Sequence, residues 1–298
     1  MQYVGMFILT MSAALLVGIA RKYNAQRSGG ALAPLVTFNT VNAVVCSVVL
    51  LLWGGFGATS TYTVLLGIVF GLTTAAQMIA YLKALEIGPM SYTTIIVSCS
   101  TLMSALSGAI FWQEKLAWAH IVGLVLMLVS FALSIEKKEG EKKSSALWLT
   151  LSLIAFLGTG MIGIMQKIHQ SSEHKAELNS FLIVAFLTAF VCNAALLCYT
   201  KHRDGTLTFR FEKPDRAKLI LLGVMVVAGT CAAVNNKLNL FLSGVVPSAV
   251  FFPIVNGGNL VLTTIVAVLV FREKLTKTQW IGVGAGILSV LFLCNPFR

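Results

Sequence analysis

The sequence predicts an all-α polytopic membrane protein, with ten transmembrane helices in two inverted five-helix repeats. Three observations lead to this fold class. Hydrophobic residues make up 57% of the 298 residues and charged residues only 11%, whereas water-soluble domains carry roughly 25% charged residues. The apolar residues form long unbroken runs, and the two halves of the chain share a set of matching positions. Long runs exclude a membrane barrel, whose strands show alternating segments of about ten residues.

Ten segments are long and apolar enough to cross a bilayer, which takes about 20 residues per helix. They are residues 3–20, 35–53, 62–82, 90–112, 117–135, 146–165, 181–199, 219–240, 245–271 and 278–293. A charged linker at residues 136–145 separates the fifth segment from the sixth. The predicted domains are therefore a first five-helix repeat at 1–135 and a second at 146–298.

The net charge of +11 comes from 22 Lys and Arg residues against 11 acidic ones, and it is confined to short connections. This placement predicts contact with a lipid bilayer and no nucleic-acid partner. Most of the positive residues lie in connections 1–2, 3–4, 5–6, 7–8 and 9–10. Because positive loops stay in the cytoplasm, we expect a multi-pass protein of the cytoplasmic membrane with both termini outside. The six cysteines lack metal-ligand spacing, so neither a metal nor a cofactor is expected.

An internal repeat runs along nearly the whole chain. The element Trp112–Leu116 is echoed 159 residues later by Phe271–Leu275, and each is followed by a glycine, Gly123 or Gly282. Because each half holds an odd number of spans, the second half must be inverted relative to the first. Inverted halves recur in secondary transporters, whose substrate site lies near the bilayer midplane between them.

These elements resemble those of a known family. The Glu-Lys-Leu element of each half, its glycine-containing last helix and a proline that opens the helix before it (Pro89, Pro247) are similar to the ten-helix EamA-like branch of the drug/metabolite transporter superfamily. The resemblance implies alternating-access transport of a small organic solute through a central cavity. It also implies cytoplasmic termini for many members, whereas the charge pattern here predicts the opposite. A monomer would be sufficient, and a dimer is possible.

Polar side chains within spans predict where a small-molecule substrate binds, because they are costly in hydrocarbon and usually face a cavity. The largest part of this polar set repeats at an offset of 158 between the two halves. The candidate substrate-binding residues are Asn256, Asn259, Gln77, Asn235, Tyr81, Asn239, Ser98, Thr101, Asn39 and Asn42. The alternative is that these side chains hold helices together through interhelical hydrogen bonds.

The ninth span combines Pro253 with Gly257 and Gly258. A glycine weakens a helix interior by about 1 kcal/mol relative to alanine, and proline removes one intrahelical hydrogen bond. We therefore expect an interrupted helix that lines the cavity. Lys237, on the eighth span, either pairs with an anionic group of the substrate or extends toward the interface. The five tryptophans fall near span ends, which predicts an interfacial belt.

No acidic or histidine residue lies deep within a predicted span, so the sequence offers no evident proton relay and no carboxylate for a hydrophobic cation. A transporter of an amino acid or comparable polar metabolite is the first choice. A multidrug or nucleobase-like solute transporter is the alternative. An intramembrane enzyme would need an embedded base beside Ser98, Cys99 or Ser100, so no catalytic residue is expected. A membrane receptor would be expected to carry longer tails or signalling domains.

Overall fold

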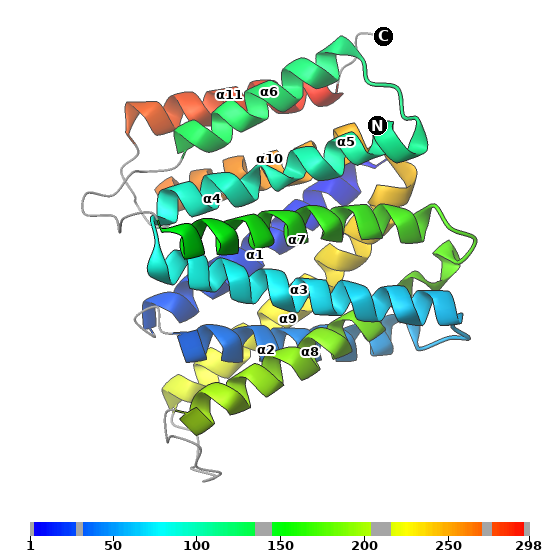
Figure 1. Cartoon of the computed structure of the whole chain (residues 1–298), viewed down its shortest axis with the longest axis vertical. Coiled ribbons are helices and arrows are strands. Elements are labelled where there is room, and N and C mark those ends of the chain that lie inside the picture. The colour runs from blue at the N-terminus through cyan, green and yellow to red at the C-terminus, as the bar shows by residue number, and fades with distance from the viewer. Residues whose placement is uncertain (1–2, 28–31, 135–144, 204–215, 270–275, 295–298) are drawn as a thin grey trace. The chain divides into compact units, whose positions relative to one another are not determined.

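The computed structural model describes residues 3–27, 32–134, 145–203, 216–269 and 276–294, and the regular structure within these ranges is helical (Figure 1). Every predicted span contains a helix, and the fourth contains two. The helices are α1 Val4–Arg27, α2 Leu32–Gly54, α3 Thr61–Ile87, α4 Met90–Ser98, α5 Ser100–Trp112, α6 Trp118–Ser134, α7 Ala146–Gln170, the 3-10 turn η1 Lys175–Glu177, α8 Leu178–Arg203, α9 Arg216–Val245, α10 Ser248–Leu269 and α11 Lys277–Cys294.

Eight helical segments within these ranges are long and apolar enough to cross a membrane, with most of α4 and all of α5 forming a single segment, Tyr92–Trp112. The helices α6 and α11 contain shorter apolar stretches, Trp118–Leu133 and Lys277–Leu293. The prediction of an all-helical multi-pass membrane protein is therefore confirmed at this level. A count of ten crossings and an inverted arrangement of the halves remain predictions.

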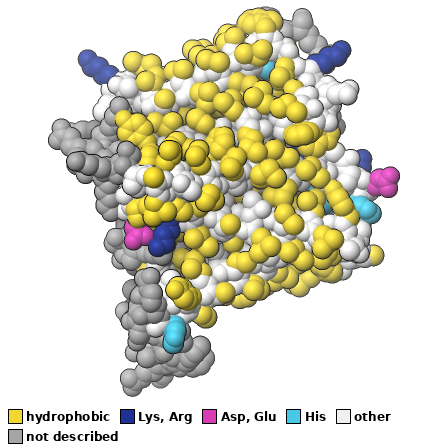
Figure 2. All heavy atoms as spheres, in the orientation of Figure 1, with side chains coloured by type: hydrophobic (Ala, Val, Ile, Leu, Met, Phe, Trp, Pro, Cys, Tyr) yellow, Lys and Arg dark blue, Asp and Glu magenta, His cyan; other side chains and the backbone are white. Residues whose placement is uncertain are grey.

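Large apolar side chains are exposed over the helices, as Figure 2 shows for one face. Leu52 is 82% exposed, Trp118 70% and Ile110 69%. Contiguous apolar surface of this extent marks contact with a membrane or another apolar partner. In a helical protein with spans of this length, the hydrocarbon of a bilayer is the partner that such surface fits.

The chain folds into two compact units, each built from segments of both sequence halves. Unit 1 comprises Met1–Phe7, Ala76–Ser171 and Leu240–Arg298, and unit 2 comprises Ile8–Ala75 and Ser172–Asn239. The helices α1, α3 and α9 each contribute residues to both units. Residues 136–145, most of which lie outside the described residues, fall within one segment of unit 1, and the predicted division into two repeats at this linker remains a prediction.

In unit 2, glycines allow helix backbones to approach closely. The helix α2 packs along α8, and α3 meets α8 at Gly71, where an added Cβ atom would overlap the carbonyl oxygen of Ala185. A buried apolar cluster that includes Phe38 and Met225 joins α2 to α9. Small residues at such contacts are typical of packing between membrane helices.

In unit 1, α6 and α11 pack against each other through two equivalent hydrogen bonds. The Oγ atom of Ser130 donates to the carbonyl oxygen of Gly282 at 2.7 Å, and that of Ser289 donates to the carbonyl oxygen of Gly123 at 2.7 Å. Both pairs are related by the repeat offset of 159. From the first contact to the second, residue numbers fall along α6 and rise along α11, so the two helices are antiparallel. Such a reciprocal exchange is what a two-fold axis produces, and it supports the predicted inversion.

Candidate functional site

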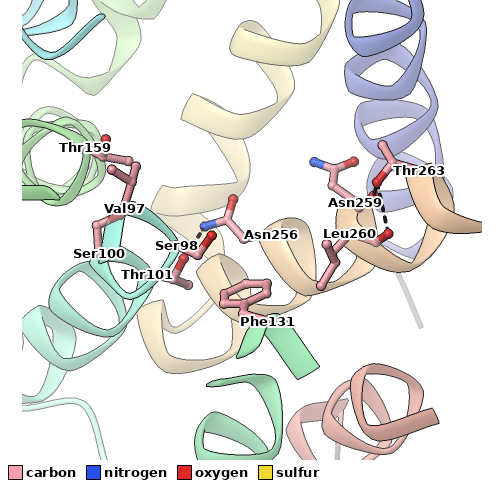
Figure 3. A pocket seen from close by; sticks show the side chains of 10 residues that line it. All are labelled: Val97, Ser98, Ser100, Thr101, Phe131, Thr159, Asn256, Asn259, Leu260 and Thr263. Atoms are coloured by element: carbon pink, nitrogen blue, oxygen red, sulfur yellow. Dashed lines mark hydrogen bonds between the residues drawn. The ribbon is translucent and has the colours of Figure 1, made fainter. Parts of the chain in front are cut away.

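Unit 1 contains an open pocket of about 300 Å³ to which α4, α5, α6, α7 and α10 contribute side chains (Figure 3). Four of the predicted site residues line it, two from each sequence half: Ser98 and Thr101, with Asn256 and Asn259. The complete lining is Val97, Ser98, Ser100, Thr101, Phe131, Thr159, Asn256, Asn259, Leu260 and Thr263.

The junction between α4 and α5 places Ser98 and Thr101 at the pocket. Cys99 interrupts the helical pattern but keeps right-handed helical dihedrals, with φ −63° and ψ −16°. Its N–H donates to the Ile95 carbonyl oxygen at 3.0 Å, and its own carbonyl oxygen accepts from the Leu102 N–H at 3.0 Å. Backbone hydrogen bonds thus bridge the junction, and the two helices continue one another.

The expected interruption of the ninth span is wrong, because α10 is continuous from Ser248 to Leu269. Pro253 follows the start of α10 closely, so the hydrogen bond that it removes belongs to the first turns. A Cβ atom on Gly257 would lie 3.6 Å from Cγ of Met127, in ordinary contact. The unbroken helix brings Asn256, Asn259 and Thr263 onto one face through spacings of three and four residues.

Hydrogen bonds decide which polar atoms of the pocket remain available. The side-chain Nδ2 of Asn256 donates to Oγ1 of Thr101 at 2.9 Å (Figure 3). The hydroxyl of Thr159 donates to the Ala155 carbonyl oxygen at 2.7 Å, and that of Thr263 donates to the Asn259 carbonyl oxygen at 2.7 Å. The oxygens of both hydroxyls keep acceptor capacity. Within the described part of the chain, Oδ1 of Asn259 is buried without a hydrogen-bond partner.

Gln77 and Tyr81 lie on α3 in unit 1, but neither lines this pocket. The side chain of Gln77 packs against α7 at Gly158, where an added Cβ atom would lie 2.7 Å from Cβ of Gln77. Gly158 precedes the pocket residue Thr159 in the sequence. Gln77 therefore supports the helix that carries part of the lining.

The remaining predicted site residues lie in unit 2. Asn235 and Asn239 on α9 share the buried Thr10 of α1, whose hydroxyl lies 2.7 Å from Oδ1 of Asn235 and 3.0 Å from Oδ1 of Asn239. Asn39 and Asn42 are half-buried on α2, and the Asn42 carbonyl oxygen lies where α9 approaches at Gly229. The hydrogen bonds around Thr10 join α1 to α9, as the helix-packing alternative predicted for such side chains.

Two further side chains differ from expectation. The Nζ atom of Lys237 lies 4.2 Å from the ring centroid of Trp53, a cation–π contact that the two predicted roles for Lys237 did not include. Trp148 is only 7% exposed, and its Nε1 donates to Oγ1 of Thr93 at 2.7 Å. Trp148 is therefore buried in the protein near the start of α7, whereas Trp53, Trp118 and Trp280 are exposed, and the interfacial belt remains a prediction.

Sequence reasoning missed a buried ion pair beside the pocket helices. The predicted sixth span ended at residue 165, but α7 continues to Gln170 and buries Lys167. Nζ of Lys167 lies 2.7 Å from Oε1 of Glu114, and Oε2 of Glu114 accepts from the backbone N–H of Ser248 at 2.7 Å. No local spacing rule could have found a pair separated by more than 50 residues in the sequence.

The turn after α5 positions Glu114 for these contacts. Gln113 adopts a left-handed conformation with φ 53°, and the Glu114 N–H returns to the Gly108 carbonyl oxygen at 3.1 Å. The carboxylate then lies against Gly108, which has no side chain to displace it. Glu114 thereby ties the end of α5 to α7 and α10. Along these two helices the junction is about 12 Å from Thr159 and Asn256, eight residues in each case.

Comparisons with known proteins agree with this architecture. Residues 4–135 match the model of the EamA-like transporter family, which belongs to the drug/metabolite transporter superfamily, so the resemblance seen in the sequence is confirmed. Solved chains also match, and one of them, a crystal structure of a protein, is 15% identical. It covers 97% of this chain and 96% of its own length with a TM-score of 0.68, which shows a shared fold. No curated protein matches the chain.

Proposed function

We propose, from the match of residues 4–135 to the EamA-like transporter family, that this chain is a secondary transporter of a small polar organic solute. It would move the solute across the cytoplasmic membrane by alternating access, and a monomer would suffice. The observation that carries the proposal is a pocket with seven hydroxyl- or amide-bearing side chains inside a unit of apolar helices. Polar groups gathered at membrane depth mark solute pathways in transporters.

Ser98, Thr101, Asn256 and Asn259 are the proposed substrate contacts. They come from the fourth and ninth predicted spans, which the predicted repeat relates, and transporters with inverted halves bind solutes between such spans. An amino acid and a nucleobase-like solute both carry groups that amides and hydroxyls bind. A cationic drug is a poorer candidate, because the buried carboxylate of Glu114 is already paired with Lys167. Gln77, Tyr81, Asn235, Asn239, Asn39 and Asn42 remain candidates for other stages of the route.

Transport is tested with the purified full chain. A thermal-shift screen of metabolites first finds a ligand, because a compound that binds the folded state raises its stability by mass action. Radiolabelled counterflow in liposomes then measures its movement. We expect the solute to cross chemically unchanged and Asn256→Ala to reduce its uptake at least tenfold. The matched control is Asn236→Ala, since among the described residues Asn236 Nδ2 donates to the Ala232 carbonyl oxygen of its own helix. Chemical conversion, or binding without movement, would contradict the proposal.

Orientation is tested separately in intact cells. The charge pattern places the α2–α3 connection outside and the linker at residues 136–145 inside. A membrane-impermeant thiol reagent should therefore label Ala58→Cys and leave Gly140→Cys unlabelled until the cells are permeabilised. The reverse pattern would place both termini in the cytoplasm, as many members of the family have them, and would overturn the orientation without affecting the transport proposal.

A further inference from the structure

The pocket is pseudo-symmetric in sequence but not in its hydrogen bonds. The repeat offset of 158 pairs Ser98 with Asn256 and Thr101 with Asn259. The Thr101–Asn256 contact is made at 2.9 Å. Its symmetry equivalent is Ser98–Asn259, and within the described residues this pair forms no hydrogen bond, while Oδ1 of Asn259 is buried without a partner. The Thr101–Asn256 pair is thus joined by a hydrogen bond, whereas its equivalent, Ser98–Asn259, is not.

The polar atoms of the pocket include both acceptors and donors, since Ser98, Ser100 and Asn259 carry O–H or N–H groups besides their oxygens. The hydroxyl groups of Thr159 and Thr263 donate hydrogen bonds to backbone carbonyl oxygens of their own helices. The amide nitrogen of Asn256 is engaged with Thr101, which leaves its Oδ1 directed away from that bond (Figure 3). The Oδ1 atom of Asn256 therefore calls for a hydrogen-bond donor on the ligand.

The described lining residues offer no compensation for a charge. All ten are neutral side chains, and an ion that leaves water for such a site loses hydration without gaining a counter-charge. Helix ends often bind carboxylates, but the α4–α5 junction is bridged by hydrogen bonds at Cys99, and α10 runs through the site without a break. The nearest ion pair described on the pocket helices, Glu114 with Lys167, is internally neutralised.

We propose that the solute bound between Ser98 and Asn259 is uncharged and carries hydroxyl or amide groups that bond to the side-chain amides of Asn256 and Asn259. Polyols, nucleosides and neutral amides share this chemistry, whereas amino-acid zwitterions, phosphorylated solutes and cations do not. The inference rests on the proposed function, since it names the substrate class of the same pocket. Asn259 is the residue whose side-chain amide holds the solute opposite Ser98.

The test measures charge selectivity at the pocket of the full chain in liposomes. The reporter is Thr263→Cys, which leaves both asparagines intact. Its tryptic segment, residues 238–272, contains no natural cysteine, so mass spectrometry assigns any modification there to position 263. Three methanethiosulfonate reagents are compared: neutral hydroxyethyl, anionic sulfonatoethyl and cationic trimethylammonium-ethyl. The exposed Glu173→Cys, between α7 and α8, gives the reactivity ratios in open water, and its segment 168–175 is also free of natural cysteine.

We expect both charged reagents to react at least tenfold more slowly than the neutral one at Thr263→Cys, after division by the ratios at Glu173→Cys. Reaction of either charged reagent within threefold of the neutral one would overturn the neutral-solute proposal and leave transport intact. No reaction with any reagent, at Thr263→Cys and also at the second reporter Thr159→Cys, would show a pocket closed to water. That result would remove the proposed substrate site itself.

Protection by solutes then identifies the class of solute. Ribitol, uridine and N-acetylglycinamide are compared with serine as probes that slow the neutral reagent at Thr263→Cys. We expect one of the neutral probes to protect at least threefold, and Asn259→Ala to abolish that protection while Asn236→Ala preserves it. Protection by serine that depends on Asn259 would overturn the proposal.

Discussion

The buried carboxylate of Glu114 shows how one side chain can join three helices. It contacts the Lys167 ammonium group and the Ser248 backbone N–H at 2.7 Å each, and the side chains of Lys167 and Glu114 are only 8% and 15% exposed. A buried pair of this kind is weak evidence of net stability, because both ions lose hydration. Its removal from one side is costly, because the partner charge is left behind.

We predict that Glu114→Gln destabilises the protein by about 3 kcal/mol, because the Lys167 ammonium would remain buried without a counter-charge. Denaturation in detergent micelles measures the loss. The control Glu173→Gln, at an exposed acidic position, should change stability by less than about 0.5 kcal/mol. The double variant Glu114→Gln/Lys167→Met should recover much of the loss. An unchanged midpoint for Glu114→Gln would mean that Lys167 is hydrated.

Some helix glycines lie in close contact with a neighbouring helix, whereas others have open space around them. An alanine side chain at Gly71 would meet the Ala185 backbone and the Thr188 side chain, whereas one at Gly18 would meet nothing within 4 Å. Both glycines lie within helices of unit 2. The same substitution therefore separates the effect of packing from that of helix propensity.

Gly71→Ala should destabilise the folded state by roughly 1–3 kcal/mol, because backbone atoms of α8 cannot move aside without a shift of the helix. Gly18→Ala should be neutral or stabilising by up to about 1 kcal/mol, because alanine is the better helix former. Thermal unfolding of both variants in the same detergent gives the comparison. Equal midpoints would show that α3 and α8 do not meet as described.

The reciprocal contacts of α6 and α11 make a prediction about symmetry. Ser130→Ala and Ser289→Ala should each cost about 0.6–1 kcal/mol, the usual value of an interhelical hydrogen bond in a membrane protein. The two losses should be alike and should add in the double variant, because the contacts are two turns, roughly 10 Å, apart along each helix. Thr150→Ala, which removes an exposed hydroxyl bonded to its own helix, serves as control. Strongly unequal losses would argue against equivalent environments.

The course of the helices could be predicted from hydropathy, but their ends could not. The length of an apolar run reflects the part of a helix that lies in the hydrocarbon, about 20 residues. The helix itself can continue beyond that run into the polar interface. This explains why α7 extends to Gln170 and buries Lys167, beyond the predicted end. The continuity of α10 was also unpredictable, because proline and glycine lower helix propensity without forcing a break when the proline lies close to the start of the helix.

For the molecule as a whole, the repeat was the most informative sequence feature. It led to Ser98, Thr101, Asn256 and Asn259, which line one pocket. It did not distinguish them from Asn235 and Asn239, which bond to Thr10, because a polar side chain in an apolar helix serves a cavity and a helix contact equally well. Thr159 escaped notice because threonines that bond their own helix are common in membrane spans.

The composition of the two units has a consequence for biosynthesis. Unit 2 requires residues up to Asn239, and unit 1 requires the segment that begins at Leu240. A ribosome releases the chain from its N-terminus, so α2 and α3 emerge long before α8, the helix that Gly71 contacts. The early helices are therefore made before the later helices that they contact. Neither unit can reach its final packing until translation is in its last quarter.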